Sequence, residues 1–298
     1  MAYLFQQLAN AVPLAALYAA LAFGYAIAFG VTRRPDITYG ALFAFAGQML
    51  LLFSDVGYNR LILVLPAALA FGAVLASAYT LGAGLLIGRS VIQPLAKTSP
   101  NTVIVAAFGV LIVLMETASL AMGSRPRWLP PFLNAPVVLW NDISFPVTLT
   151  EIQLLDTVLM SAIVLGGAAV LRYTAWARIW RAVNEEPLAA ELCGLSTSRV
   201  FLTAYGSATL IATVCGLLST SYYGTMDFGA GMMFGLKVLL IASVGGYGNP
   251  LKSAGGAAAL AFAETLWSAY GPLLWRDLMV FTLLVVLLVS SRRERVIP

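Results

Sequence analysis

Five charged side chains lie inside or beside long apolar stretches of the sequence, where an unpaired charge is costly. They are Glu116, Glu151, Asp156, Lys237 and Glu264. Charged groups at such positions usually pair with one another or line a water-filled cavity. Two kinds of chemistry are therefore open. Either these residues form a relay for protons or ions, or Lys237 forms a buried charge pair with Glu264 or another carboxylate. In the second case Glu151 and Asp156 lie at the outer end of their helix.

Enzymatic and metal chemistry are disfavoured. The sequence of 298 residues contains no histidine, which removes the commonest transition-metal ligand and the commonest general base at neutral pH. The glycine runs at 245–248 and 253–259 are not followed by the Lys-Ser/Thr pair of a phosphate-binding loop, and neither is placed as a dinucleotide fingerprint. We therefore predict that the chain is not an enzyme, holds no metal ion and binds no cofactor of its own.

A polar segment at 173–199 carries the signals of a short helix of about two turns. The residues that mark its ends are Asn184 as N-cap, Glu185 and Glu186 near the positive terminus, Pro187 in the first turn and Gly194 at the stop. Its expected apolar edge consists of Leu188, Leu192 and Cys193. Such a helix suits a groove on another protein. The alternative is a loop helix that lies on lipid.

The composition indicates what surrounds these groups. The chain is 60% hydrophobic and 10% charged, with a mean hydropathy of +0.89, whereas soluble domains are about 45–50% apolar and about 25% charged. This excess of apolar residues excludes a water-soluble protein and predicts one that crosses a membrane several times.

Apolar segments of nearly membrane-spanning length occur at 10–31, 38–54, 61–88, 102–122, 151–172, 200–222, 232–246, 253–271 and 277–291. Two of them, 38–54 and 232–246, are short and bordered by glycine, and whether they cross fully is left open. We predict an all-α fold: one transmembrane domain over 1–298, built as a helical bundle of eight or nine segments with two short or broken helices.

Lysine and arginine in the connections predict the orientation, because positive charge is retained in the cytoplasm. With the N-terminus outside and the C-terminus cytoplasmic, twelve of these residues face the cytoplasm and four face outward. The net charge of +4 is then explained by topology rather than by nucleic-acid binding. The prolines of the outer loop at 123–150 are expected to exclude a continued helix. Because the loop is also rich in tryptophan, we expect it to lie flat on the outer face as a lid or a partner contact.

The two halves of the chain share a layout. Residues 10–88 and 200–271 each contain a long span, a polar break, a short span and a long span, in opposite orientations, which is the inverted repeat typical of transporters. In such proteins the breaks line the passage. We therefore predict a translocation pathway lined in the first break by Asp36, Thr38, Tyr39 and Gly40, and in the second by Thr225, Asp227, Gly229 and Gly231.

Nearly the whole chain resembles one family. The run from Glu185 to Leu195, read as Glu-Glu-Pro-x-Ala-Ala-x-x-x-Gly-Leu, is similar to the Glu-Asp-Pro-x-Ala-Ala-x-x-x-Gly-Ile signature of permeases in branched-chain amino acid (LivH/LivM) ABC importers. The stretch 17–25, and Lys237 followed by a Gly-Gly-x-Gly run and Glu264, also resemble that family. In length the chain is more similar to the LivH type.

The resemblance implies that 184–194 is the coupling helix, which docks on an ATP-binding subunit. The matching positions are Glu185, Glu186, Pro187, Ala189, Ala190 and Gly194. It further implies a bacterial inner (plasma) membrane location, a second permease subunit that is LivM-like or an identical copy, two ATP-binding subunits that carry ATP and Mg, and an extracytoplasmic substrate-binding protein. The chain itself would form the passage for branched-chain or other hydrophobic amino acids or related small molecules.

One departure affects the cargo. The family commonly reads Asn-Phe-Ala-His-Gly where this chain reads Asp36-Ile37-Thr38-Tyr39-Gly40, which adds a charge and removes a titratable ring, so the resemblance does not fix the substrate. The rival hypothesis is a self-contained, ion-coupled secondary transporter in which Glu116, Lys237 and Glu264 form the relay.

Overall fold

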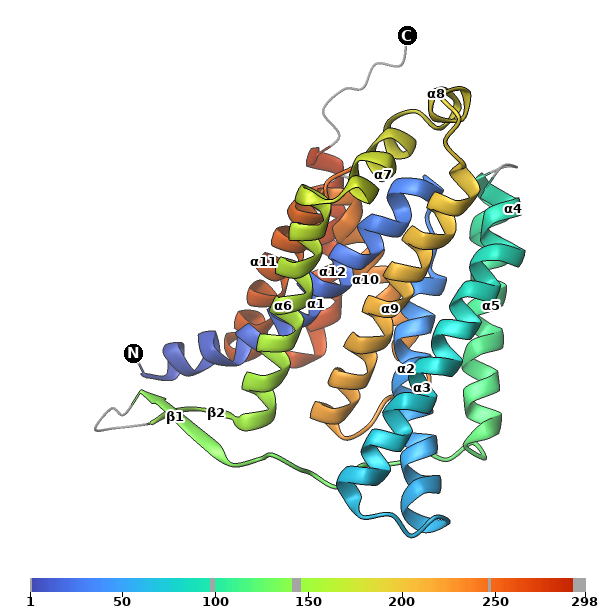
Figure 1. Cartoon of the computed structure of the whole chain (residues 1–298). Coiled ribbons are helices and arrows are strands. Elements are labelled where there is room, and N and C mark those ends of the chain that lie inside the picture. Colours follow the sequence, from blue (N-terminus) through green and yellow to red (C-terminus); the bar gives the residue numbers. More distant parts are fainter. Residues whose placement is uncertain (1, 97–99, 141–145, 246–247, 292–298) are drawn as a thin grey trace.

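The computed structural model describes residues 2–96, 100–140, 146–245 and 248–291, and it is almost entirely helical (Figure 1). Lys97, Gly246, Tyr247 and the arginines at 292, 293 and 295 lie outside the described residues. The elements in chain order are α1 (Ala2–Thr32), α2 (Thr38–Asn59), α3 (Leu65–Ile87), the π-turn η1 (Gly88–Ile92), α4 (Gln93–Ala96), α5 (Pro100–Ala121), β1 (Pro136–Trp140), β2 (Val147–Thr150), α6 (Glu151–Tyr173), α7 (Ala175–Glu185), α8 (Pro187–Leu192), α9 (Thr197–Tyr223), α10 (Ala230–Gly245), α11 (Pro250–Tyr270), the 3₁₀ turn η2 (Leu273–Trp275) and α12 (Arg276–Ser291).

Each of the nine predicted apolar segments falls on a helix, which confirms an all-α polytopic bundle. Within the described residues, seven helices are long and apolar enough to cross a membrane. The other two predicted segments are α10, which has 16 residues, and α11, which carries Lys252 and the buried Glu264.

The expectation of a short helix at 38–54 was wrong. The helix α2 has 22 residues and continues to Asn59, because its polar last turns find partners instead of ending the helix. The Asn59 side-chain amide donates to the Asp55 carboxylate over 2.7 Å, and Asp55 also forms an ion pair with Arg127 of the outer loop. Only α10 has the short length that we expected of both segments.

The bundle surrounds α1, which packs against α6, α9, α10 and α11. Of the most apolar window of α1, 78% is buried, whereas the same measure is 11% for α6 and for α12. Because apolar side chains left at the surface of a spanning helix are solvated by lipid tails, α6 and α12 present lipid-facing or partner-facing surfaces. The large buried side chains of the core include Tyr18, Phe23, Tyr25, Phe43 and Gln48.

The loop at 123–150 contains a short antiparallel hairpin, which we did not predict. Strands β1 and β2 pair Pro136 with Thr150 and Val138 with Thr148. The Gln6 side chain of α1 binds the backbone of Thr148 through both its amide nitrogen and its oxygen, at 2.8 and 2.9 Å. The expectation that the prolines exclude a helix is confirmed for 125–140 and 146–150.

The bundle has two distinct ends (Figure 1). The start of α1 and the hairpin lie at one end, which we call the hairpin end. At the other end, called the α8 end, are α7, α8 and the end of α12. Helix α1 finishes at the α8 end, where α9 begins, so the first helices of the two expected repeats run in opposite directions, as an inverted repeat requires.

Candidate functional site

The segment at 173–199 forms two helices at the α8 end. The first, α7, is capped by the Thr174 hydroxyl, which accepts a hydrogen bond from the Ala177 amide. The helix buries Ala177, Trp180 and Val183, three positions spaced by three residues that fall on one face. This buried face carries α7 through Asn184 to Glu185. The prediction of Asn184 as an N-cap was therefore wrong.

The short helix α8 follows, with Glu186 in the N-cap position and Pro187 in the first turn. It ends at Leu192 with Cys193 as C-cap, and the predicted stop, Gly194, follows directly with a φ of +82° that favours glycine. One residue of α8, Ala190, is buried against the bundle. Its leucines are exposed, with exposed fractions of 71% for Leu188 and 86% for Leu192, and the predicted Glu185, Glu186 and Ala189 are also exposed.

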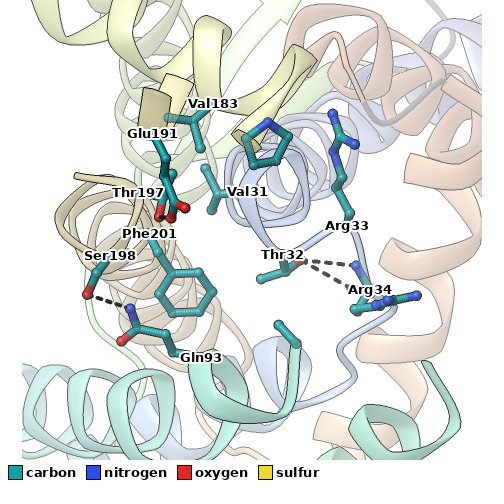
Figure 2. A pocket seen from close by; sticks show the side chains of 12 residues that line it. Val31, Thr32, Arg33, Arg34, Gln93, Val183, Glu191, Thr197, Ser198 and Phe201 are labelled. Atoms are coloured by element: carbon teal, nitrogen blue, oxygen red, sulfur yellow. Dashed lines mark hydrogen bonds between the residues drawn. The ribbon is translucent and has the colours of Figure 1, made fainter. Parts of the chain in front are cut away.

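A cavity of about 450 Å³ lies beside α8 (Figure 2). Its walls come from α8 through Pro187 and Glu191, from the end of α1 through Val31 and Thr32, and from the start of α9 through Phe201. Across the cavity from α1, the Gln93 amide donates to the Ser198 hydroxyl over 2.6 Å. The cavity leaves α8 without close packing on this side.

The first break lies next to this cavity and is tightly hydrogen-bonded. The Asp36 carboxylate accepts hydrogen bonds from the Thr38 hydroxyl (2.5 Å), the Thr38 amide (2.9 Å) and the Tyr205 hydroxyl (3.0 Å). Burial raises the pKa of the Asp36 carboxyl above its ordinary value, and the hydrogen bonds from Thr38 and Tyr205 offset only part of this rise. Because Tyr205 belongs to α9, this network joins the start of α2 to the helix that follows α8.

The structure brings the two predicted breaks together at their glycines. A Cβ atom on Gly40 would lie 2.3 Å from the Gly235 Cα atom and 2.5 Å from the Gly231 carbonyl oxygen, so α2 and α10 touch backbone to backbone. Asp36, Thr38, Tyr39, Gly40 and Gly231 are buried, Thr225 and Gly229 are partly buried, and Asp227 is exposed. In this conformation the first break is a packed joint, and its assignment to the passage stays a prediction.

We expect Gly40→Ala to destabilise the bundle by about 1–3 kcal/mol, because backbone atoms cannot give way as a flexible side chain can. The matched control is Gly82→Ala in α3, where an added Cβ meets nothing within 4 Å and should stabilise by about 0.5–1 kcal/mol. Thermal unfolding of the two purified variants in detergent measures the difference. An unfolding midpoint of Gly40→Ala at or above that of the parent would contradict the close α2–α10 contact.

The structure places Lys237 of α10 against Glu264 of α11, with 2.9 Å between Nζ and Oε1. The Tyr18 hydroxyl of α1 donates to the other carboxylate oxygen over 2.9 Å. Around them, Asp277 lies 3.4 Å from Lys237 and Arg276 lies 3.7 Å from Glu264. The group joins four helices. The other three predicted charges form none of these ion pairs. Glu116 and Glu151 are exposed, and Asp156 is buried in α6.

Comparison with known proteins identifies the family. A family model described as the permease component of branched-chain amino acid transport systems matches residues 7–288. The chain belongs to this permease family. The family is one of transport components rather than of enzymes, so the chain is a multi-pass membrane permease.

Three curated relatives of this permease illustrate the range of similarity. The LivH permease protein of the high-affinity branched-chain amino acid transport system of Escherichia coli K12 is 28% identical over 96% of this chain and 93% of the relative. The Salmonella typhimurium LivH protein is 27% identical over the same shares. The Pseudomonas aeruginosa BraD permease protein is 23% identical over 95% and 92%. No solved structure matches the chain significantly.

Sequence reasoning on this permease missed four residues around the predicted sites. Tyr205 and Tyr18 complete the two buried polar groups, Asp277 extends the charge group, and Arg33 binds the end of α7. From the sequence, Arg33 counted only as one of the positive charges that predict the orientation of the chain. Tyr18 and Tyr205 lie 246 and 169 residues from their carboxylate partners, so no local spacing could pair them. A tyrosine inside an apolar run is itself a signal, because a buried phenol usually has a polar partner.

Proposed function

We propose that this chain is the passage-forming permease subunit of a bacterial ABC importer in the inner membrane, with the α8 end cytoplasmic and the N-terminus outside. Partner subunits supply the energy. Two ATP-binding subunits hold ATP and Mg, and this chain binds neither. A second permease, LivM-like or an identical copy, completes the pathway, and an extracytoplasmic binding protein delivers the cargo at the hairpin end.

The observation that carries the proposal is the exposure of α8. Contiguous exposed apolar surface often marks an interaction site, and Leu188 and Leu192, four residues apart on a six-residue helix, are both exposed. This helix lies within the run 185–195, which resembles the signature of the family. A short helix with an apolar edge suits a groove on a partner protein, and the ATP-binding subunit is the partner that we assign to it.

The names of the relatives support a class of cargo. Proteins named as branched-chain amino acid permeases align over nearly the whole chain, and we propose a branched-chain or other hydrophobic amino acid, or a related small molecule. The first break carries Asp36 and Tyr39, two departures from the family pattern, so closely related amides or carboxylates are the alternatives. Calorimetric titration of the cognate binding protein with leucine, and with lysine as the control, tests the class. Tighter binding of lysine would overturn it.

Reconstitution separates this proposal from an ion-coupled carrier. Proteoliposomes that contain the chain alone should take up no labelled cargo under an imposed proton or sodium gradient. Proteoliposomes with both permeases, the ATP-binding subunits and the binding protein should take it up only with internal ATP. Uptake by the chain alone under an ion gradient would overturn the proposal.

A further inference from the structure

Helix α8 is supported at its two ends. At its far end the Thr197 hydroxyl of α9 donates to the Glu191 carboxylate. Between the ends, Ala190 is the buried residue of α8, and the 450 Å³ cavity lies on the side toward α1. A displacement of α8 can therefore reach the bundle through the start of α9, through the end of α7 and through the packing of Ala190.

The helix α7 is fixed to α1 by an interlocking contact. The Trp180 indole nitrogen donates to the Ile27 carbonyl oxygen over 3.1 Å. Its ring occupies the space left by Gly30, where a Cβ would lie 2.6 Å from the indole Cζ2 atom. The middle of α7 therefore cannot slide along α1 without a clash.

The end of α7 is held by Arg33, which comes directly after the last residue of α1. The Arg33 guanidinium donates to the carbonyl oxygens of both Asn184 and Glu185, the last two residues of α7. Helix-terminal carbonyls lack partners within the helix and favour a cation. The last turn of α7 has no basic residue of its own, so Arg33 supplies the charge from another helix.

The backbone at Arg33 is set for this reach. Its φ is +51°, in the left-handed region that costs a non-glycine residue about 1 kcal/mol. Three residues further along the chain is Asp36, whose carboxylate binds Thr38 of α2 and Tyr205 of α9. Arg33 therefore connects the α7–α8 junction, through its hydrogen bonds, to a point three residues before Asp36 in the first break.

We propose that Arg33 is a positioning residue that carries the displacement of α8 into the end of α1 and the first break. The inference rests on the proposed function of α8 as the ATPase contact. Arg33 touches neither cargo nor nucleotide. It acts by making the junction before Glu186 move together with Asp36.

The test compares three variants in the complete transporter. Arg33→Asn removes the guanidinium, and asparagine tolerates a positive φ. Both bonds come from the Nη2 atom of Arg33; Arg33→Lys keeps the charge and one donor nitrogen, and loses the planar guanidinium and its longer reach. The control is Arg34→Gln, which removes a neighbouring positive charge and leaves the hydrogen bonds from Arg33 to the end of α7 in place. For each variant we measure cargo uptake, ATP hydrolysis and the amount of ATP-binding subunit that co-purifies.

We expect Arg33→Asn to lower the cargo taken up per ATP hydrolysed about fivefold, within the range for residues that couple two sites. Arg33→Lys should give a smaller loss and Arg34→Gln none, and the ATP-binding subunits should co-purify normally in all three. An unchanged ratio in Arg33→Asn would overturn the inference. Loss of the ATP-binding subunits from both Arg33 variants would also overturn it, because Arg33 would then hold the assembly together. Neither outcome decides whether α8 binds the ATP-binding subunit, which is tested separately by replacing Leu188 and Leu192.

Discussion

Replacing Leu188 and Leu192 together by glutamate is expected to abolish ATP-dependent uptake while the permease still folds. Both side chains are largely exposed, so the change removes little packing within the chain. In the assembly, burial of a leucine in a partner groove contributes about 1.5–3 kcal/mol. Losing both leucines therefore weakens the affinity for the ATP-binding subunit by a factor of about 100 or more. Two buried carboxylates would add a desolvation cost in the same direction.

Co-purification of the ATP-binding subunits with the detergent-solubilised permease measures this effect directly. The matched control is Ile62→Glu, at a residue that is 87% exposed in the loop between α2 and α3, at the hairpin end. It should leave the ATP-binding subunits bound. If the double leucine variant retains them and transports normally, α8 is a loop helix that rests on lipid, and the proposed coupling site is lost.

The positions of the helices could be predicted from the sequence because lipid imposes a simple rule on length and polarity. Where a helix ends depends on contacts that a hydropathy pattern does not contain. The helix α2 continues past Asp55 because Asn59 and Arg127 bind that carboxylate. The helix α7 continues through Asn184 because the face that carries Trp180 and Val183 is buried and because Arg33, which is distant in the sequence, binds the end of the helix.

The candidate sites also include features that a local sequence signal predicts and features that depend on distant partners. Local helix-end signals predicted the short helix α8 and its glycine stop at Gly194, because a positive φ just after a helix leaves a local mark in the sequence. The buried state of the first break was not foreseen, since it depends on Tyr205 and on the contact between Gly40 and Gly235. These partners are far apart in the sequence and belong to different halves of the repeat, so only the packed bundle unites them.

The second large effect concerns the buried charges. Lys237→Met should destabilise the folded permease by about 3–5 kcal/mol, because it leaves the Glu264 carboxylate buried without its closest counter-charge. The Tyr18 hydroxyl still donates to that carboxylate, but a neutral donor cannot balance a charge. Thermal unfolding of the purified permease in detergent measures the loss. The control is Lys252→Met, at an exposed lysine in the first turn of α11, which should leave the unfolding midpoint unchanged.

The double variant Lys237→Met with Glu264→Met decides what the pair is for. If the charges serve only to join α10 to α11, removing both should recover most of the lost stability, since a buried ion pair can be replaced by apolar side chains at little cost. Transport by the complete assembly should recover with it. A double variant that is stable but inactive would show that the charges take part in transport itself, and would return the relay of Lys237 and Glu264 as the better account of these residues.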